Sequence, residues 1–124
     1  MRDEDRIDTV PVIMTGKTSV SFESLDLGAG ERGEIVLSPE RPMRNPTLYM
    51  SDKGSTVQVE SVFHGLAEIP PLGQRPSGAY RFGLRLGVTV TADEPIKIVV
   101  VNRGPESTYI GASLVDTPES DNAA

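Results

Sequence analysis

The stretch YRFGLRLGVTV, residues Tyr80–Val90, alternates at every step between an apolar residue and a glycine, arginine or threonine. A period of two over this length is typical of a β-strand with one buried face. Arg81 and Arg85 fall on the opposite face, and the glycines at 83 and 87 permit a bend or a close approach by a neighbouring chain. The alternation therefore predicts a long strand at the core of the fold.

Further apolar runs lie on both sides of this stretch, separated by residues that favour turns. The chain holds ten prolines and twelve glycines, and most of them stand between the apolar runs. Such spacing punctuates strands and does not by itself indicate disorder. The other predicted strands are Val10–Met14, Lys17–Leu25, Glu34–Leu37, Thr47–Met50, Thr56–Phe63, Ile96–Val101 and Tyr109–Val115.

About eight strands and no convincing helix predict an all-β fold. The expected architecture is a single antiparallel β-sandwich, jelly-roll-like, because two packed sheets bury one face of each strand. An immunoglobulin-like sandwich of seven strands is the alternative. With 124 residues, the chain has room for one domain with a hydrophobic core.

Charge divides the chain into a body and two ends. Of the net charge of −6, residues 1–8 carry −2 and residues 116–124 carry −3, which leaves −1 for the body. We therefore expect a charged N-terminal tail (1–8), a β-sandwich domain (9–115) and an acidic C-terminal tail (116–124). A nearly neutral body argues against nucleic acid as a partner. No stretch has the roughly 18–20 apolar residues of a membrane span, so no membrane partner is expected.

Residues suited to catalysis or metal binding are few. The chain has no cysteine, and His64 is its only histidine, so imidazole-rich metal sites and Ser-His-acid catalysis find little support. Residues 28–33 match the spacing G-x-G-x-x-G, but a strand is predicted after them where a dinucleotide site needs a helix, so they are interpreted as a loop joining two strands. We expect no catalytic residue, no cofactor, no metal and no enzymatic activity.

The segment His64–Gly78 is rich in proline and glycine and is predicted as a long loop. Loops of this length are often functional, although a plain crossover between two sheets is an equal alternative. The candidate interface residues are those on this loop and on the outward faces of the last strands: Pro70, Pro71, Arg75, Arg81, Arg85 and Tyr109. For Arg81 and Arg85, the alternative interpretation is that they lie on a solvated polar face.

The last third of the chain resembles small jelly-roll-type virion proteins of bacteriophages. The resemblance lies in the Val/Ile-rich run Ile96–Val101, the following Asn102-Arg103-Gly104, and the aromatic strand Tyr109-Ile110-Gly111-Ala112. It covers residues 80–115 and rests on a pattern without a diagnostic motif. It implies a decoration, vertex or minor capsid protein, made in the host cytoplasm and located in the virion.

A virion protein of this kind acts as a homo-oligomer, such as a trimer or pentamer, whose partners are itself and other capsid proteins. Two alternatives remain open at this point. One is a β-sandwich binding or adhesion module of a cytoplasmic cellular assembly, and the other is a small sugar-binding or cupin-like domain. The aromatic content of 5% is low for a sugar-binding platform.

Overall fold

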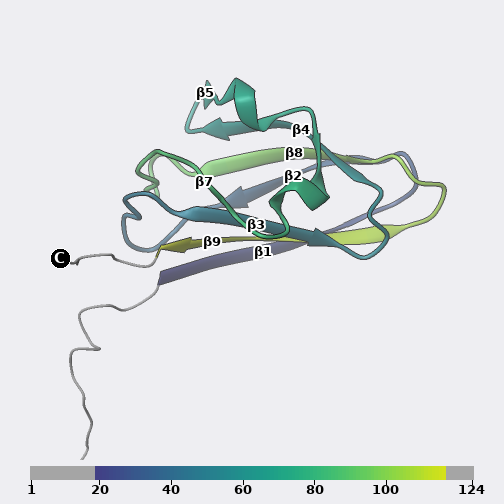
Figure 1. Ribbon diagram of the computed structural model, residues 1–124, viewed down its shortest axis with the longest axis horizontal. Helices are drawn as coiled ribbons and strands as arrows, with labels where there is room; N and C mark the ends of the chain where they lie inside the picture. Colours follow the sequence, from purple (N-terminus) through teal and green to yellow (C-terminus); the bar gives the residue numbers. More distant parts are fainter. Residues whose placement is uncertain (1–18, 117–124) are drawn as a thin grey trace, which may run out of the picture.

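A computed structural model describes residues 19–116 of the chain, which form a sandwich of two antiparallel sheets (Figure 1). We name the four-stranded sheet, with strand order β1-β9-β3-β7, sheet A, and the other, with order β2-β8-β4-β5 and β6 also paired to β4, sheet B. The strands of sheet A are β1 (Ser19–Leu27), β9 (Thr108–Asp116), β3 (Thr47–Asp52) and β7 (Leu84–Arg85). The strands of sheet B are β2 (Arg32–Leu37), β8 (Ile96–Asn102), β4 (Val57–His64), β5 (Ala67–Glu68) and β6 (Arg75–Pro76).

The strand order is that of a jelly roll. Antiparallel pairs are nested along the chain: β4 pairs with β5, β3 with β7, β2 with β8, and β1 with β9. The nested pairs form one long hairpin of paired strands. This hairpin folds over on itself, so that β3 also pairs with β9 and β4 with β8. The prediction of an all-β, jelly-roll-like sandwich is confirmed, and the immunoglobulin-like alternative, with its ABED and CFG sheets, has a different strand order.

The prediction of a long strand over Tyr80–Val90 is wrong. Its first residue ends the 3-10 helix η2 (Ser77–Tyr80), its middle contains only the two-residue β7, and Val90 makes an isolated bridge to Met43. Two positive φ angles, 93° at Gly83 and 75° at Gly87, interrupt the extended backbone. A side chain at Gly83 is excluded as well, because its Cβ would stand 2.7 Å from the ring of Tyr49.

The alternation nevertheless predicted part of the core correctly. Tyr80, Leu86 and Val90 are buried, while Leu84 and Val88 are half-buried and pack against the core. Phe82, expected on the same face, is 87% exposed instead. The chain turns at Arg81, whose backbone is α-helical, so Phe82 does not keep the direction that a continuous strand would impose.

The other strand predictions that fall on described residues are confirmed to within two residues at each end. Alternation between core and surface is clear in β3, where Leu48 and Met50 are buried and Tyr49 is exposed. The predicted strand Val10–Met14, the N-terminal tail and residues 117–124 of the C-terminal tail lie outside the described residues. Asp116 belongs to β9, where it pairs with Ser19 of β1.

The loop His64–Gly78 is a crossover that covers one edge of sheet B. After β4 the chain forms β5, the 3-10 helix η1 (Pro70–Leu72) and β6, and both short strands pair with β4. The chain then crosses through η2 to sheet A. The hydroxyl of Tyr80 donates a hydrogen bond to the carbonyl of Leu72, and burial raises the pKa of this phenol. Tyr80 therefore ties the two 3-10 helices together inside the core.

Asn102 holds one end of the sandwich together. Its amide nitrogen donates to the carbonyls of Gly28 (3.1 Å) and Glu106 (2.7 Å), and its oxygen accepts from the Thr56 hydroxyl (2.8 Å). A buried amide with this many partners joins loops from both sheets.

Within residues 19–116, no helix is long and apolar enough to cross a lipid bilayer.

Candidate functional site

On β1, β9 and β3, the outer face of sheet A carries almost no charge. In β1, β9 and β3 the buried residues point to the core, so the intervening positions face outward. We call these outward positions the aromatic face: Val20, Phe22, Ser24, Asp26, Thr47, Tyr49, Ser51, Tyr109, Gly111, Ser113 and Val115. Asp26 is the one charged residue among them, in a chain of which 24% is charged.

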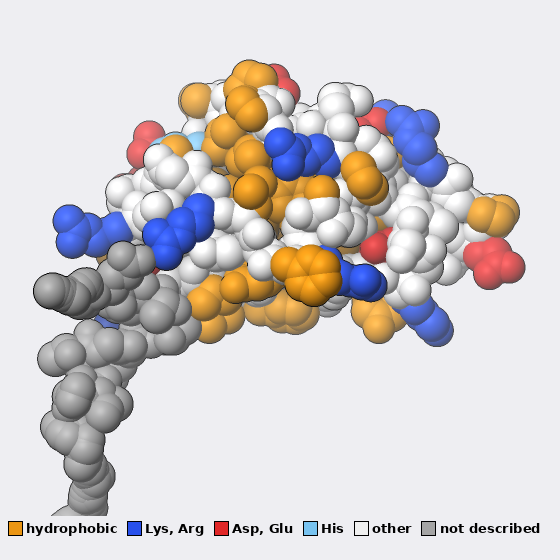
Figure 2. All heavy atoms as spheres, viewed as in Figure 1, with side chains coloured by type: hydrophobic (Ala, Val, Ile, Leu, Met, Phe, Trp, Pro, Cys, Tyr) orange, Lys and Arg blue, Asp and Glu red, His pale blue; other side chains and the backbone are white. Residues whose placement is uncertain are grey.

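Large apolar side chains stand exposed on the aromatic face. Phe22 is 62% exposed, Val20 61% and Tyr109 51%. Figure 2 shows hydrophobic side chains gathered along the lower side of the molecule, where Figure 1 places β1 and β9. A contiguous exposed apolar patch on a small protein marks a site of interaction more often than a single exposed residue does.

A hollow of about 130 Å³ lies in the middle of this face. It is bounded by Phe22 of β1 on one side and Tyr49 of β3 on the other, and Gly111 and Ser113 of β9 contribute to its lining. The register explains this arrangement, because Phe22 and Tyr49 both pair with Ser113 from opposite sides. A Cβ at Gly111 would stand 3.3 Å from the Phe22 ring, so the small residues of β9 leave the space between the two rings.

The outer face of sheet B is built differently. Arg32 of β2 donates two hydrogen bonds to the carboxylate of Glu60 on β4, at 2.7 and 3.0 Å, and Arg103 lies 3.7 Å from the same carboxylate. The hydrogen bond from Arg32 holds the pKa of Glu60 below its usual range. Farther along, Lys97 Nζ lies 5.0 Å from the centre of the Phe63 ring. This face is therefore a polar surface on which Arg32, Glu60 and Lys97 each contact a neighbouring side chain.

The structure places the six predicted interface residues in two regions. Arg81 lines the hollow and Tyr109 belongs to the aromatic face, while Arg85 lies on β7 at the margin of the same sheet. Pro70, Pro71 and Arg75 lie on the crossover beside sheet B, where Arg75 Nε donates to the carbonyl of Pro71 at 3.0 Å. The predicted interface residues therefore do not form one surface.

Sequence reasoning missed Phe22 and Tyr49, the two rings beside the hollow. A signal for Phe22 was present: in β1 the apolar residues change parity, with Val20 and Phe22 at even positions and Leu25 and Leu27 at odd ones. Such a switch means that both faces of one strand carry large apolar side chains. For Tyr49, the signal is the unbroken apolar run from 48 to 50.

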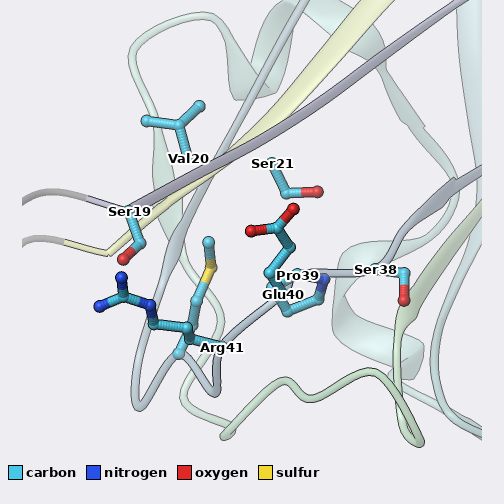
Figure 3. A pocket seen from close by; sticks show the side chains of 8 residues that line it. Ser19, Val20, Ser21, Ser38, Pro39, Glu40 and Arg41 are labelled. Carbon is cyan, nitrogen blue, oxygen red and sulfur yellow. The ribbon is translucent and has the colours of Figure 1, made fainter.

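A second hollow, of about 430 Å³, lies between the beginning of β1 and the segment Ser38–Met43 (Figure 3). In this view the carboxylate of Glu40 points toward Ser21, and the guanidinium of Arg41 lies on the side of Ser19. Its wall is mostly polar, and Ser19 is the first described residue. This hollow brings together no residues with a shared catalytic or metal-binding chemistry.

His64 and the glycine-rich loop have structural partners. His64 Nε2 lies 2.7 Å from the carbonyl oxygen of Thr89 and 3.9 Å from the carboxylate of Glu94. Residues 28–33 connect β1 to β2, as expected of a loop between strands, and the Gly28 amide donates to the Glu31 carboxylate at 2.6 Å. Among residues 19–116, no group of three or more His, Cys, Asp or Glu side chains is placed to hold a metal ion.

The site in this part of the chain is therefore the aromatic face with its hollow. Comparisons of the chain with protein-family models, with curated proteins and with solved structures found no match.

Proposed function

We propose that this chain is a non-enzymatic structural protein of a phage or virus-like capsid. In this proposal it is a decoration, vertex or minor capsid protein that acts as a homo-oligomer, made in the host cytoplasm and resident in the virion. The observation that carries the proposal is the contrast between the two outer faces of the jelly roll. On sheet B, Arg32 is paired with Glu60, whereas the aromatic face of sheet A has Asp26 as its one charged residue and exposes aromatic rings.

The jelly-roll fold by itself is compatible with several classes of protein and does not decide between them. Jelly rolls occur in viral capsid proteins, in lectins and in cupins, and a fold does not imply a function. The aromatic face adds what a shell component needs, namely a surface that becomes more stable when it is covered. Covering it requires no rearrangement of the sandwich, because its residues lie on three long, paired strands.

The position of the two ends of the described chain also supports assembly. Ser19 pairs with Asp116, so β1 begins beside the end of β9 (Figure 1). The described chain therefore begins and ends at the same end of the sandwich, and the sequence segments 1–8 and 116–124 carry net charges of −2 and −3. In the proposal these ends contact other capsid proteins, and the aromatic face contacts further copies of the chain.

The test is the composition of purified particles. Particles induced from the source culture and banded on a density gradient are analysed by mass spectrometry, with ribosomal proteins as the contamination control. We expect peptides of this chain in a stoichiometric amount relative to the major shell protein. Enrichment in the soluble cell fraction and absence from the particles would contradict the proposal.

The sugar-binding alternative rests on the same rings, because a sugar can stack on exposed Phe22 and Tyr49. A glycan array with the purified chain distinguishes a sugar-binding module from a structural protein. Binding to a glycan that is lost in Tyr49→Ala would favour a sugar-binding module, and an empty array together with presence in particles would favour the structural protein.

A further inference from the structure

We propose that two copies of this chain pack through their aromatic faces, with the Phe82 ring of each copy entering the hollow between Phe22 and Tyr49 of the other. This inference rests on the proposed function and names the partner of that surface. Its elements are a protruding ring, a hollow of matching size beside it, and charges arranged at the margins of the face.

Phe82 is placed to act as the protruding side chain. Its exposed fraction of 87% is the largest among the aromatic residues described. Its two neighbours in the chain fix its position relative to the face: Arg81 lines the hollow, and Gly83 packs against the ring of Tyr49. The short 3-10 helix before it is anchored by buried Tyr80, so Phe82 projects from a fixed turn.

The hollow has the size of a ring. A cavity of about 150 Å³ holds a benzene molecule, and the hollow measures about 130 Å³. Because Arg81 and Gly83, the two chain neighbours of Phe82, lie at the hollow of their own copy, a two-fold axis passing close by would exchange the two Phe82 rings reciprocally. Reciprocal contacts of this kind are the property of an isologous dimer interface.

The charges at the margins favour a second copy over an acidic or basic partner. Asp26 lies on β1 at one margin of sheet A, and Arg81 precedes β7 at the other. A two-fold axis parallel to the strands places the β1 margin of one copy over the β7 margin of the other, so each acidic margin meets a basic one. Along β1, β9 and β3 the aromatic face carries Asp26 as its one charged residue, so two copies of net charge −6 can approach with few like charges opposed.

The size of the face is that of a small interface. β1 and β9 are nine residues long and β3 is six, so at about 3.3 Å per residue and about 4.8 Å between strands the face measures roughly 15 Å by 20–30 Å. Standard interfaces bury about 800 Å² on each partner. We therefore expect a reversible dimer, and the measurement has to extend to protein concentrations of about 100 μM or more.

The experiment is sedimentation velocity of the full chain and its variants over a concentration series. Phe82→Ala removes the ring, and Ser113→Phe fills the hollow from within the same copy. Leu66→Ala is the matched control, because Leu66 is a fully exposed apolar residue on the crossover beside sheet B. Circular dichroism and thermal melting establish that each variant is folded.

We expect the wild-type chain and Leu66→Ala to dimerise with the same dissociation constant, and both face variants to weaken dimerisation at least tenfold. A wild-type chain that stays monomeric at every concentration would overturn the inference. Association that persists unchanged in Phe82→Ala and in folded Ser113→Phe would also overturn it, by placing the contact elsewhere. Neither result bears on whether the chain is present in particles, so failure of this inference is distinguishable from failure of the proposed function.

Discussion

The two outer faces of the sandwich follow the same strand geometry but have opposite chemistry. On sheet B, Arg32, Glu60 and Arg103 form a connected set of charge pairs, and Lys97 covers the Phe63 ring. On sheet A, Phe22 and Tyr49 stand on either side of a hollow lined by small residues. The comparison shows that strand geometry alone does not set the chemistry of an outer face, and the self-association proposed above rests on this difference.

The largest expected effect is a difference in stability between substitutions at two adjacent residues of β3, one facing the core and one facing outward. Leu48 is fully buried, so Leu48→Ala removes core packing and is expected to lower the free energy of unfolding by about 2–5 kcal/mol. Tyr49→Ala, on the aromatic face, is expected to change it by about 0.5 kcal/mol or less in the monomer. Chemical denaturation of dilute protein measures both, and equal losses would show that Tyr49 belongs to the core.

A smaller effect concerns the response of self-association to salt. Association through the aromatic face buries mostly apolar area and brings Asp26 and Arg81 together only at the margins, so raising the salt concentration should change the dissociation constant only slightly. Association through the charged side chains of sheet B should weaken strongly instead. Sedimentation at about 50 mM and about 500 mM sodium chloride makes the distinction. Clear weakening at the higher concentration would assign the contact to sheet B.

The ion pair on sheet B should make a modest contribution to stability that depends on pH. Because Arg32 lowers the pKa of Glu60 in the folded chain, the contribution is present above the pKa of an unfolded glutamate. It is lost as the pH falls through the lower pKa of the folded state. Melting temperatures between pH 7 and pH 3 should therefore fall less steeply in Glu60→Gln than in the wild type. Parallel curves would show that the pair contributes nothing.

The smallest expected effect is at His64. A glutamine at this position keeps a nitrogen that can donate to the carbonyl of Thr89, the partner of His64 Nε2. We expect His64→Gln to leave the melting temperature, the dissociation constant of the dimer and any partner binding within experimental error. Loss of a measured activity in this variant would contradict the proposal of a non-enzymatic protein.

Sequence periodicity predicted the strands wherever the backbone is continuously extended. The run at 108–116 buries alternate residues, and the apolar run at 96–102 forms a strand that is buried or half-buried at every position. The run at 57–64 alternates up to a bulge between Val59 and Ser61. Between residues 80 and 90 the pattern failed. Gly83 and Gly87 turn the chain, and yet Leu86 and Val90 still reach the core, whereas Phe82 does not. Alternation predicted a strand only where no residue within it adopts a positive φ.

For the candidate site, the sequence located Arg81 and Tyr109 but not the two rings between which the hollow lies. Phe22 and Tyr49 are 27 positions apart in the sequence. Only the pairing of β1 and β3 with β9 brings their rings to the same hollow. Pro70, Pro71 and Arg75 were chosen because they lie on the predicted loop His64–Gly78, and Arg81 because it faces outward on the predicted strand that follows. The crossover places them beside sheet B instead. Distance along the chain was a poor guide in both cases.

The sequence by itself determined that this chain forms two packed β-sheets, because alternation and turn residues are local properties that the backbone must satisfy wherever the strand lies. Only the tertiary structure decided that β9 lies between β1 and β3. Strand pairing joins backbone groups that are the same in nearly every residue, so a short run carries little information about its neighbours. The aromatic face exists because of that pairing, which brings Phe22 and Tyr49 to either side of Gly111 and Ser113.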